Sequence, residues 1–125
     1  MTKEPLKILL VEDDESQKLF LERIISRLGH TVMGTVSSGH AAIRSVEKLS
    51  GIDLILMDVR LDDDMDGIAA MAEIRKTSDI KVIYISGFGD DEMKRRAVQT
   101  HYHYFLTKPV TIDKLKFAID DAFSV

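Results

Sequence analysis

Short apolar runs alternate with amphipathic stretches along the whole chain. The run Leu6–Val11 stops at three consecutive acids, and Ile52–Met57 is almost entirely apolar, so both are typical of buried strands. The stretch Ser16–Leu28 spaces its apolar residues by three and four and stops at Gly29, which predicts a helix. By the same criteria we predict strands at Leu6–Val11, Thr31–Val36, Ile52–Met57, Lys81–Ile85 and His103–Leu106, and helices at Ser16–Leu28, Gly39–Leu49, Gly67–Lys76, Asp90–Gln99 and after a Thr111 cap, with Ile112, Leu115, Ile119 and Ala122 facing inward.

Five strands that alternate with five helices predict parallel βαβ units, and therefore an α/β fold with helices on both faces of one sheet. The first, third and fourth strands are continuously apolar, as expected of strands that are covered on both faces. The weaker alternation and the glycine in Thr31–Val36 favour a place at the edge of the sheet. Because there is no repeat or linker, we expect a single domain over residues 1–125.

Composition narrows the classes of function. The 125 residues contain no Cys, which excludes disulfides and thiolate metal sites. A net charge of −4 argues against a nucleic-acid surface, and the apolar runs are too short to span a bilayer. The N-terminus has no apolar signal region, so the expected location is the cytoplasm. One domain leaves no room for an output domain, so we expect the chain to act on another protein or to have been separated from its own effector.

Polar residues follow the predicted strands at their carboxyl ends, where open parallel sheets bind ligands. Glu12 and Asp13 end the first strand, Asp58 ends the third and Ser86 ends the fourth, while Lys108 follows the fifth. Each of them alone has an ordinary explanation, such as a helix cap, a strand end or a turn. Their joint occurrence on four separate strands indicates a site.

The chemistry of this set favours a cation and a phosphoryl group. Three neighbouring carboxylates repel one another, so a bound cation or shared protons must offset their charge. Carboxylate oxygens without His or Cys suit a hard ion, and Mg²⁺ best. A lysine and a hydroxyl complement the remaining oxygens of a phosphoryl group. Because the set has no Ser–His pair and no activated Cys, the nucleophile would be a carboxylate, and Asp58 is the most central.

A second pattern competes for the acidic loop. Asp62, Asp64, Asp66, Gly67 and Glu73 satisfy the spacing of a calcium-binding loop. Such a loop needs a helix on each side, whereas the segment before it is strand-like. We interpret the match as coincidental and expect Asp66 to cap a helix that contains Glu73. A calcium-binding protein that uses Asp62 to Glu73 is kept as an alternative function.

Four segments together resemble the receiver domain of two-component response regulators. They read ILLVEDDES, DLILMDVRL, VIYISG and YFLTKP, and the resemblance covers a core of about residues 6–123. It implies a doubly wound (βα)5, flavodoxin-like three-layer sandwich. Its five-stranded parallel sheet would have the strand order 2-1-3-4-5.

The resemblance also implies a role for each polar residue. Asp58 would be the phosphoacceptor, and Lys108 would bind the phosphoryl group. Mg²⁺, with Mn²⁺ as an alternative, would be held by Glu12, Asp13, Asp58 and the backbone carbonyl of Arg60, with Glu12 acting through water.

Two further groups of residues follow from the same resemblance. Ser86 and Phe105 would form the switch, since Ser86 would bond a phosphoryl oxygen and Phe105 would change rotamer with that movement. Gly87, Phe88 and Arg60 would flank the phosphoryl group. We hypothesise that the bulk of Phe88 limits the access of water and lengthens the lifetime of the acyl phosphate.

The chain departs from the family pattern in two places. Asp62 stands where the family commonly has a proline, and the loop before Asp66 is one residue longer, so its conformation is not implied. Phe105 replaces a common Tyr and cannot make a hydroxyl hydrogen bond. The Lys108–Pro109 peptide is expected to be cis.

We therefore expect a signalling phosphoacceptor, not an enzyme, that assists its own phosphorylation and dephosphorylation. Its phosphoryl donor would be a histidine kinase or a histidine phosphotransfer protein. Its output would be the surface of the fourth helix, fifth strand and fifth helix, with a phosphorylation-dependent homodimer left open. We expect no direct contact with nucleic acid or with a membrane. A degenerate receiver that acts as a constitutive interaction domain is the other alternative.

Overall fold

The computed structural model describes residues 5–61, 64–87 and 90–124 of the chain. Strands and helices alternate as predicted. Their bounds are β1 (Lys7–Val11), α1 (Glu15–Arg27), β2 (Thr31–Val36), α2 (Gly39–Lys48), β3 (Leu54–Asp58), α3 (Gly67–Arg75), β4 (Lys81–Ser86), α4 (Asp91–Ala97), the short 3-10 helix η1 (Val98–Thr100), β5 (Tyr104–Thr107) and α5 (Ile112–Ala122).

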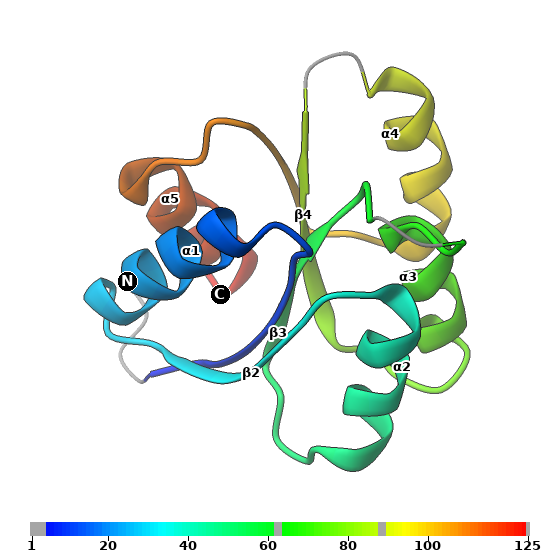
Figure 1. The fold of residues 1–125 in the computed structure, drawn as a ribbon, viewed down its shortest axis with the longest axis horizontal. Helices are drawn as coiled ribbons and strands as arrows, with labels where there is room; N and C mark the ends of the chain where they lie inside the picture. The colour runs from blue at the N-terminus through cyan, green and yellow to red at the C-terminus, as the bar shows by residue number, and fades with distance from the viewer. Residues whose placement is uncertain (1–4, 62–63, 88–89, 125) are drawn as a thin grey trace.

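The strands form one parallel sheet in the order β2-β1-β3-β4-β5. This confirms the α/β class, the edge position of Thr31–Val36 and the strand order that the resemblance implied. Helices α1 and α5 cover one face of the sheet, and α2, α3 and α4 cover the other (Figure 1). Since all five strands run the same way, their carboxyl ends lie at one edge, which we call the carboxyl edge.

The sheet separates two apolar cores, and each central strand contributes to both. In β1, Ile8 and Leu10 pack toward α1 and α5, whereas Leu9 and Val11 pack toward α2 and α3. Successive side chains of a strand point to opposite faces, so a strand covered on both sides must be apolar at every position. This explains the continuous apolar runs that marked the buried strands in the sequence.

The first turns of four helices are capped by side chains. Asp14 accepts a hydrogen bond from the amide of Gln17 in α1, and Ser38 caps α2 in the same way. Asp66 caps α3 and Thr111 caps α5, as the sequence predicted. Each cap satisfies one of the amides that a helix start leaves without a partner.

The predicted fourth helix, Asp90–Gln99, is shorter than expected. Its α-helical part ends at Ala97 and continues as η1, because the hydroxyl of Thr100 donates to the carbonyl of Ala97 at 2.6 Å. His101 then adopts a left-handed conformation with φ of 54° and turns the chain toward β5. Hydrophobic spacing carries no signal for either event.

Two strands are displaced from their predicted bounds. The prediction Ile52–Met57 becomes Leu54–Asp58 in β3, because Asp58 continues the ladder opposite Ile85 of β4. The fifth strand is likewise Tyr104–Thr107, one residue later than predicted. In both cases a polar residue belongs to the strand end, so the apolar run alone marked the end too early.

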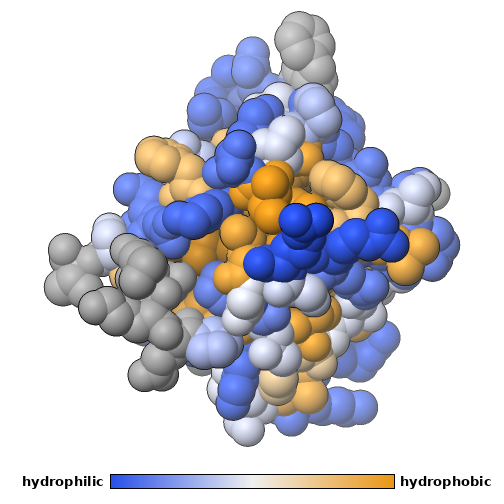
Figure 2. Space-filling view, turned by 90° about the vertical axis from the view of Figure 1, so that its left-hand side faces the viewer, coloured by the Kyte–Doolittle hydropathy of each residue, from blue (hydrophilic) through white to orange (hydrophobic). Residues whose placement is uncertain are grey.

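The face formed by α1 and α5 carries apolar side chains at its centre among charged ones (Figure 2). On this side of the sheet, Leu19 and Phe117 are each more than half exposed, and Phe20 is 41% exposed. Within the described residues, no helix has both the length and the apolar character that crossing a membrane requires.

Candidate functional site

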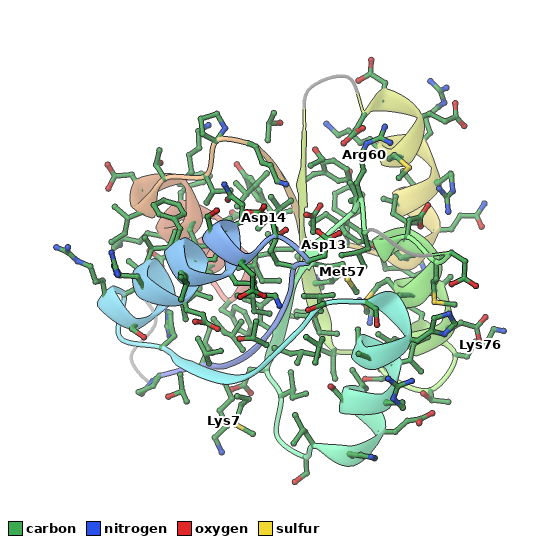
Figure 3. All side chains as sticks on the ribbon, viewed as in Figure 1. Lys7, Asp13, Asp14, Met57, Arg60 and Lys76 are labelled. Carbon is green, nitrogen blue, oxygen red and sulfur yellow. The ribbon has the colours of Figure 1, made fainter. Side chains whose placement is uncertain are left out.

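Three carboxylates meet at the carboxyl edge of the sheet. Glu12 and Asp13 follow β1, Asp58 is the last residue of the neighbouring β3, and an oxygen of each lies within 4.8 Å of the others. Figure 3 shows Asp13 at the end of β1, with Arg60 farther toward α4 on the same side of the sheet. The structure thus brings together the acids that the sequence placed at separate strand ends.

The side chain of Asp58 is 3% exposed and is bound on both oxygens. Its Oδ1 accepts the backbone N–H of Arg60 at 3.0 Å, and its Oδ2 accepts a hydrogen bond from Lys108 Nζ at 3.2 Å. Lys108 crosses to this position from the end of β5, where its own N–H donates to the carbonyl of Ser86. The buried carboxylate of Asp58 therefore has a partner on each of its two oxygens, and one of these partners is the side chain of Lys108.

Glu12 is the least satisfied polar group of the site. Glu12 is 1% exposed, and its Oε2 accepts a hydrogen bond from the backbone N–H of Asp14 at 3.1 Å. Its Oε1 has no hydrogen-bond partner among the described residues. The pKa of Glu12 is raised to about 7, chiefly because the group is buried and also because of the neighbouring charge of Asp58, against the opposing effect of the Asp14 amide. A bare buried oxygen among carboxylates is what a bound cation would satisfy.

The donor set fits a magnesium ion. It consists of carboxylate oxygens alone, it lies in a polar edge of the sheet, and one buried oxygen is left without a donor. Among the described residues, this is the only group of three or more potential metal-ligating side chains that lie close enough to share an ion.

Ser86 and Phe105 border the same hollow beside this edge. Ser86 ends β4 and is 3% exposed, while Phe105 of β5 is half-buried. The Phe105 ring packs on Tyr84 and Tyr102, with ring centroids 5.6 and 5.5 Å apart, and Lys94 Nζ lies 5.8 Å above it. The hollow is about 350 Å³ in volume and is lined by Ser86, Gly87, Asp90, Asp91, Lys94, Phe105 and Thr107.

Of the three residues predicted to flank the phosphoryl group, the structure describes Arg60 and Gly87, and both contact Asp90. The guanidinium of Arg60 contacts the carboxylate of Asp90, and the amide of Gly87 donates to the same carboxylate at 3.0 Å. Phe88 lies outside the described residues, as does Asp62 of the acidic loop. The Lys108–Pro109 peptide is cis, as the resemblance implied.

Gly67 is a functional position that sequence reasoning missed. A Cβ added to it would lie 2.2 Å from the carbonyl oxygen of Asp58, and its own N–H donates to the carbonyl of Val59 at 2.9 Å. Glycine is therefore required for the start of α3 to pack against the strand end that carries the phosphoacceptor candidate. The only sequence signal was its place at the start of a helix after the acidic loop.

The calcium-loop pattern is not matched by the surrounding structure. The element before the loop is the strand β3, where a calcium loop needs a helix. Asp66 caps α3 and is paired with Arg96, and Glu73 of α3 is paired with Lys76, which directly follows the helix. These contacts confirm the interpretation of Asp66 as a cap of a helix that contains Glu73.

Comparison with known proteins points to one family. The family model described as response regulator receiver domain matches residues 8–120. The transcriptional regulatory protein GlrR of Escherichia coli (strain K12) is 36% identical over 123 residues, which cover 98% of this chain and 27% of that protein. The sensor kinase CckA of Brucella abortus is 33% identical over 116 residues, covering 91% of this chain and 12% of that protein. This chain thus spans about a quarter or less of these relatives.

A solved structure has the same fold. The receiver domain of sensor histidine kinase PA1611 from Pseudomonas aeruginosa, described with a magnesium ion coordinated in its active-site cleft, superposes with a TM-score of 0.82. It is 29% identical, and the match covers 93% of this chain and 95% of that one.

Proposed function

The chain belongs to the response regulator receiver domain family, and on this basis we propose that it accepts a phosphoryl group on Asp58 from a phosphohistidine partner. The observation that carries the proposal is the position of Asp58, which is buried at the carboxyl edge close to two other acids and has an oxygen 3.2 Å from Lys108 Nζ. This carboxylate has a nucleophilic oxygen, a neighbouring cation and an acidic metal site within reach of one another.

The transfer is an in-line displacement. An oxygen of Asp58 attacks the phosphorus, an O–P bond forms, and the P–N bond to the partner's histidine breaks with its electron pair passing to the imidazole, which takes up a proton. Lys108 Nζ exchanges its bond to Asp58 Oδ2 for one to a phosphoryl oxygen, and the Ser86 hydroxyl donates to another. The chemistry that a Mg²⁺ ion supplies, when held by Glu12, Asp13, Asp58 and the carbonyl of Arg60, is neutralisation of the phosphoryl oxygens.

Hydrolysis returns the domain to its starting state. Water attacks the phosphorus, the acyl phosphate releases inorganic phosphate, and the Asp58 carboxylate is restored. The chain therefore assists its own phosphorylation and dephosphorylation. It acts as a signalling phosphoacceptor, and its output is the phosphorylated state of the domain, not the phosphate that is released.

Phosphorylation would be read out through Ser86 and Phe105. The hollow that both residues border gives the Phe105 ring a space to move into when Ser86 is drawn toward the phosphoryl group. That movement changes the exposed surface made by α4, β5 and α5, and it shifts a population between two arrangements. A protein that binds this surface, or a second copy of the chain, is the proposed target.

The phosphoryl donor is proposed to be a histidine kinase or a histidine phosphotransfer protein. It has to approach Asp58 past α1, where Phe20 and Val110 form an apolar groove that Lys108 also lines. The groove is lined by residues of α1 and of the segment between β5 and α5, including Lys108, so a docked helix of the donor would place its histidine close to Lys108 and Asp58.

Exposure to a small phosphodonor tests the function. Incubation with acetyl phosphate and Mg²⁺ should add the mass of one phosphoryl group to the intact protein, and chelation of the ion should prevent it. Asp58→Asn should abolish the addition. Asp79→Asn, which removes an exposed acid at the opposite end of β4, should leave it intact. An unmodified parent protein would refute the proposal and favour a constitutive interaction domain.

A calcium titration separates the remaining alternative. A calcium-binding protein would bind Ca²⁺ tightly through the acidic loop and lose that binding in Glu73→Gln. We expect no such dependence on Glu73, because the element before the acidic loop is a strand and Glu73 is paired with Lys76 at the end of α3.

A further inference from the structure

Helix capping does not explain why the side chain of Asp90 is buried. Asp90 occupies the residue before α4, but it makes no hydrogen bond to an amide of the first turn. The residues at the same position of α1, α2, α3 and α5 all make that bond. The carboxylate of Asp90 is nevertheless 2% exposed, so its burial requires other partners.

Both oxygens of Asp90 are bound to groups at the candidate phosphorylation site. Oδ1 accepts a hydrogen bond from Arg60 Nε at 2.7 Å and forms an ion pair with Arg60 Nη2 at 2.5 Å. Oδ2 accepts the backbone N–H of Gly87 at 3.0 Å. A carboxylate held by a guanidinium and an amide is a charge-assisted arrangement, and it is stronger than bonds between neutral groups.

The two partners of Asp90 lie just after neighbouring strand ends, Arg60 two residues after Asp58 at the end of β3 and Gly87 directly after β4. The amide of Arg60 donates to Asp58 Oδ1 at 3.0 Å, which fixes the start of the Arg60 side chain beside the phosphoacceptor candidate. Gly87 follows Ser86 directly, and β4 pairs with β3 up to Asp58. The guanidinium of Arg60 and the amide of Gly87 are therefore nearby donors that could bind the oxygens of a phosphoryl group on Asp58.

We infer that Asp90 is an internal counter-anion, which occupies the Arg60 guanidinium and the Gly87 amide until a phosphoryl group on Asp58 displaces it. The inference rests on the proposed function and names a further positioning residue for it. A carboxylate and a phosphoryl group carry charge of the same sign and require the same donors, so each weakens the binding of the other. Asp90 thus lowers the affinity of the site for a phosphoryl group and stabilises the unphosphorylated arrangement.

The position of Asp90 also connects the site to α4. Asp90 lies immediately before α4, and its bond to Arg60 ties this helix to the loop after β3. Displacement of the carboxylate would release that tie at the moment of phosphorylation. The site and the α4 surface would then be coupled through Asp90 in addition to the Ser86 and Phe105 pair.

The affinity for beryllofluoride, a mimic of the phosphoryl group, tests this role. Calorimetric titration in the presence of Mg²⁺ should show that Asp90→Asn binds about fivefold more tightly than the parent, because the neutral amide competes less for Arg60. The same variant should melt at a lower temperature without ligand. Asp91→Asn is the matched control, since Asp91 is exposed and lines the same hollow, and its affinity should change by less than about twofold.

A second variant guards against poor folding of the first. Asp90→Ser offers a neutral hydroxyl that can cap α4, and it should show the same gain in affinity. If both Asp90 variants bind no more tightly than Asp91→Asn, or more weakly than the parent, Asp90 is not a competing anion. If the parent binds no better than Asp58→Asn, the proposed function itself is refuted, and this result is distinct from the others.

Discussion

Buried polar groups differ between the carboxyl edge of the sheet and the opposite edge, where the strands begin and which we call the amino edge. At the amino edge, His30 is buried beside β1, and its Nδ1 accepts the backbone N–H of Leu6 at 3.0 Å. At the carboxyl edge, Glu12 is buried more deeply, yet its Oε1 lacks a hydrogen-bond partner among the described residues. The first group completes the fold, whereas the second costs stability until a ligand satisfies it.

This difference separates the residues that build the fold from those that build the site. Buried polar groups that serve only the fold find their partners within the chain. The acids of the carboxyl edge are instead held close together against their own repulsion. Three substitutions probe the contrast, and they are ordered by the size of the expected effect.

The largest effect is expected at Gly67, on the carboxyl edge. In Gly67→Ala the new methyl group would overlap the carbonyl of Asp58, so the start of α3 or the end of β3 must move. Urea unfolding should show a loss of about 3 kcal/mol in the free energy of unfolding, as for an overpacked core. Acetyl phosphate labelling should also slow, because the displaced backbone carries Asp58.

Gly34 of β2 provides the matched control for this change. A Cβ there would meet only the side chains of Leu9 and Leu49 at 3.7 and 3.8 Å, which are ordinary contact distances. Gly34→Ala should therefore change the free energy of unfolding by less than about 1 kcal/mol. Equal losses in the two variants would show that Gly67 has no special relation to Asp58.

The next effect concerns Glu12 and has the opposite sign. Because the folded protein raises the pKa of Glu12 from 4.5 to about 7, ionisation of this group destabilises the fold progressively above pH 4.5 and fully above about pH 7. In the absence of divalent ions at pH 8, Glu12→Gln should be more stable than the parent by about 2 kcal/mol. The gain should disappear as the pH falls toward 4.5.

Addition of Mg²⁺ should reverse the ranking of these two proteins. The ion should raise the melting temperature of the parent and leave that of Glu12→Gln almost unchanged, since the variant loses one of the carboxylates. Glu47→Gln, at an exposed position of α2, should follow the parent in both conditions. A parent that gains nothing from Mg²⁺ would contradict the assignment of the acids as a metal site.

The smallest effect is expected at the amino edge. Burial lowers the pKa of His30 from its ordinary value of 6.5, against an opposing influence of Asp120. The unfolded chain then binds the proton more readily, so stability falls as the pH drops below 6.5. His30→Gln should lose about 1 kcal/mol at pH 8 through its altered bond to Leu6, and should show a shallower decline below pH 6.5.

A second histidine contributes to the same dependence of stability on pH, and its contribution must be separated from that of His30. Burial, together with the charges of Lys81 and Arg75, lowers the pKa of His103 as well. His103→Gln should remove the part of the loss of stability at low pH that is due to His103, without affecting the contact between His30 and Leu6. If His30→Gln keeps the full slope of the parent, His30 is not a proton-linked part of the amino edge.

Sequence reasoning succeeded where a residue's neighbours are dictated by the strand pattern. Apolar runs and parallel topology were enough to bring Glu12, Asp58 and Lys108 to one edge, because strand ends converge in an open sheet. It failed where a contact joins two loops, as for Asp90 and Arg60, or where a close approach needs glycine, as at Gly67. Such contacts depend on the path of each loop in space, which hydrophobic spacing does not encode.

The carboxyl edge is most directly tested by locating the acyl phosphate itself. Borohydride reduces an aspartyl phosphate to homoserine, and tandem mass spectrometry of the resulting peptides identifies the modified position. After treatment with acetyl phosphate and Mg²⁺, we predict homoserine in place of Asp58 and an unchanged Asp13. Modification of Asp13 or of any other acid, with Asp58 unchanged, would contradict it.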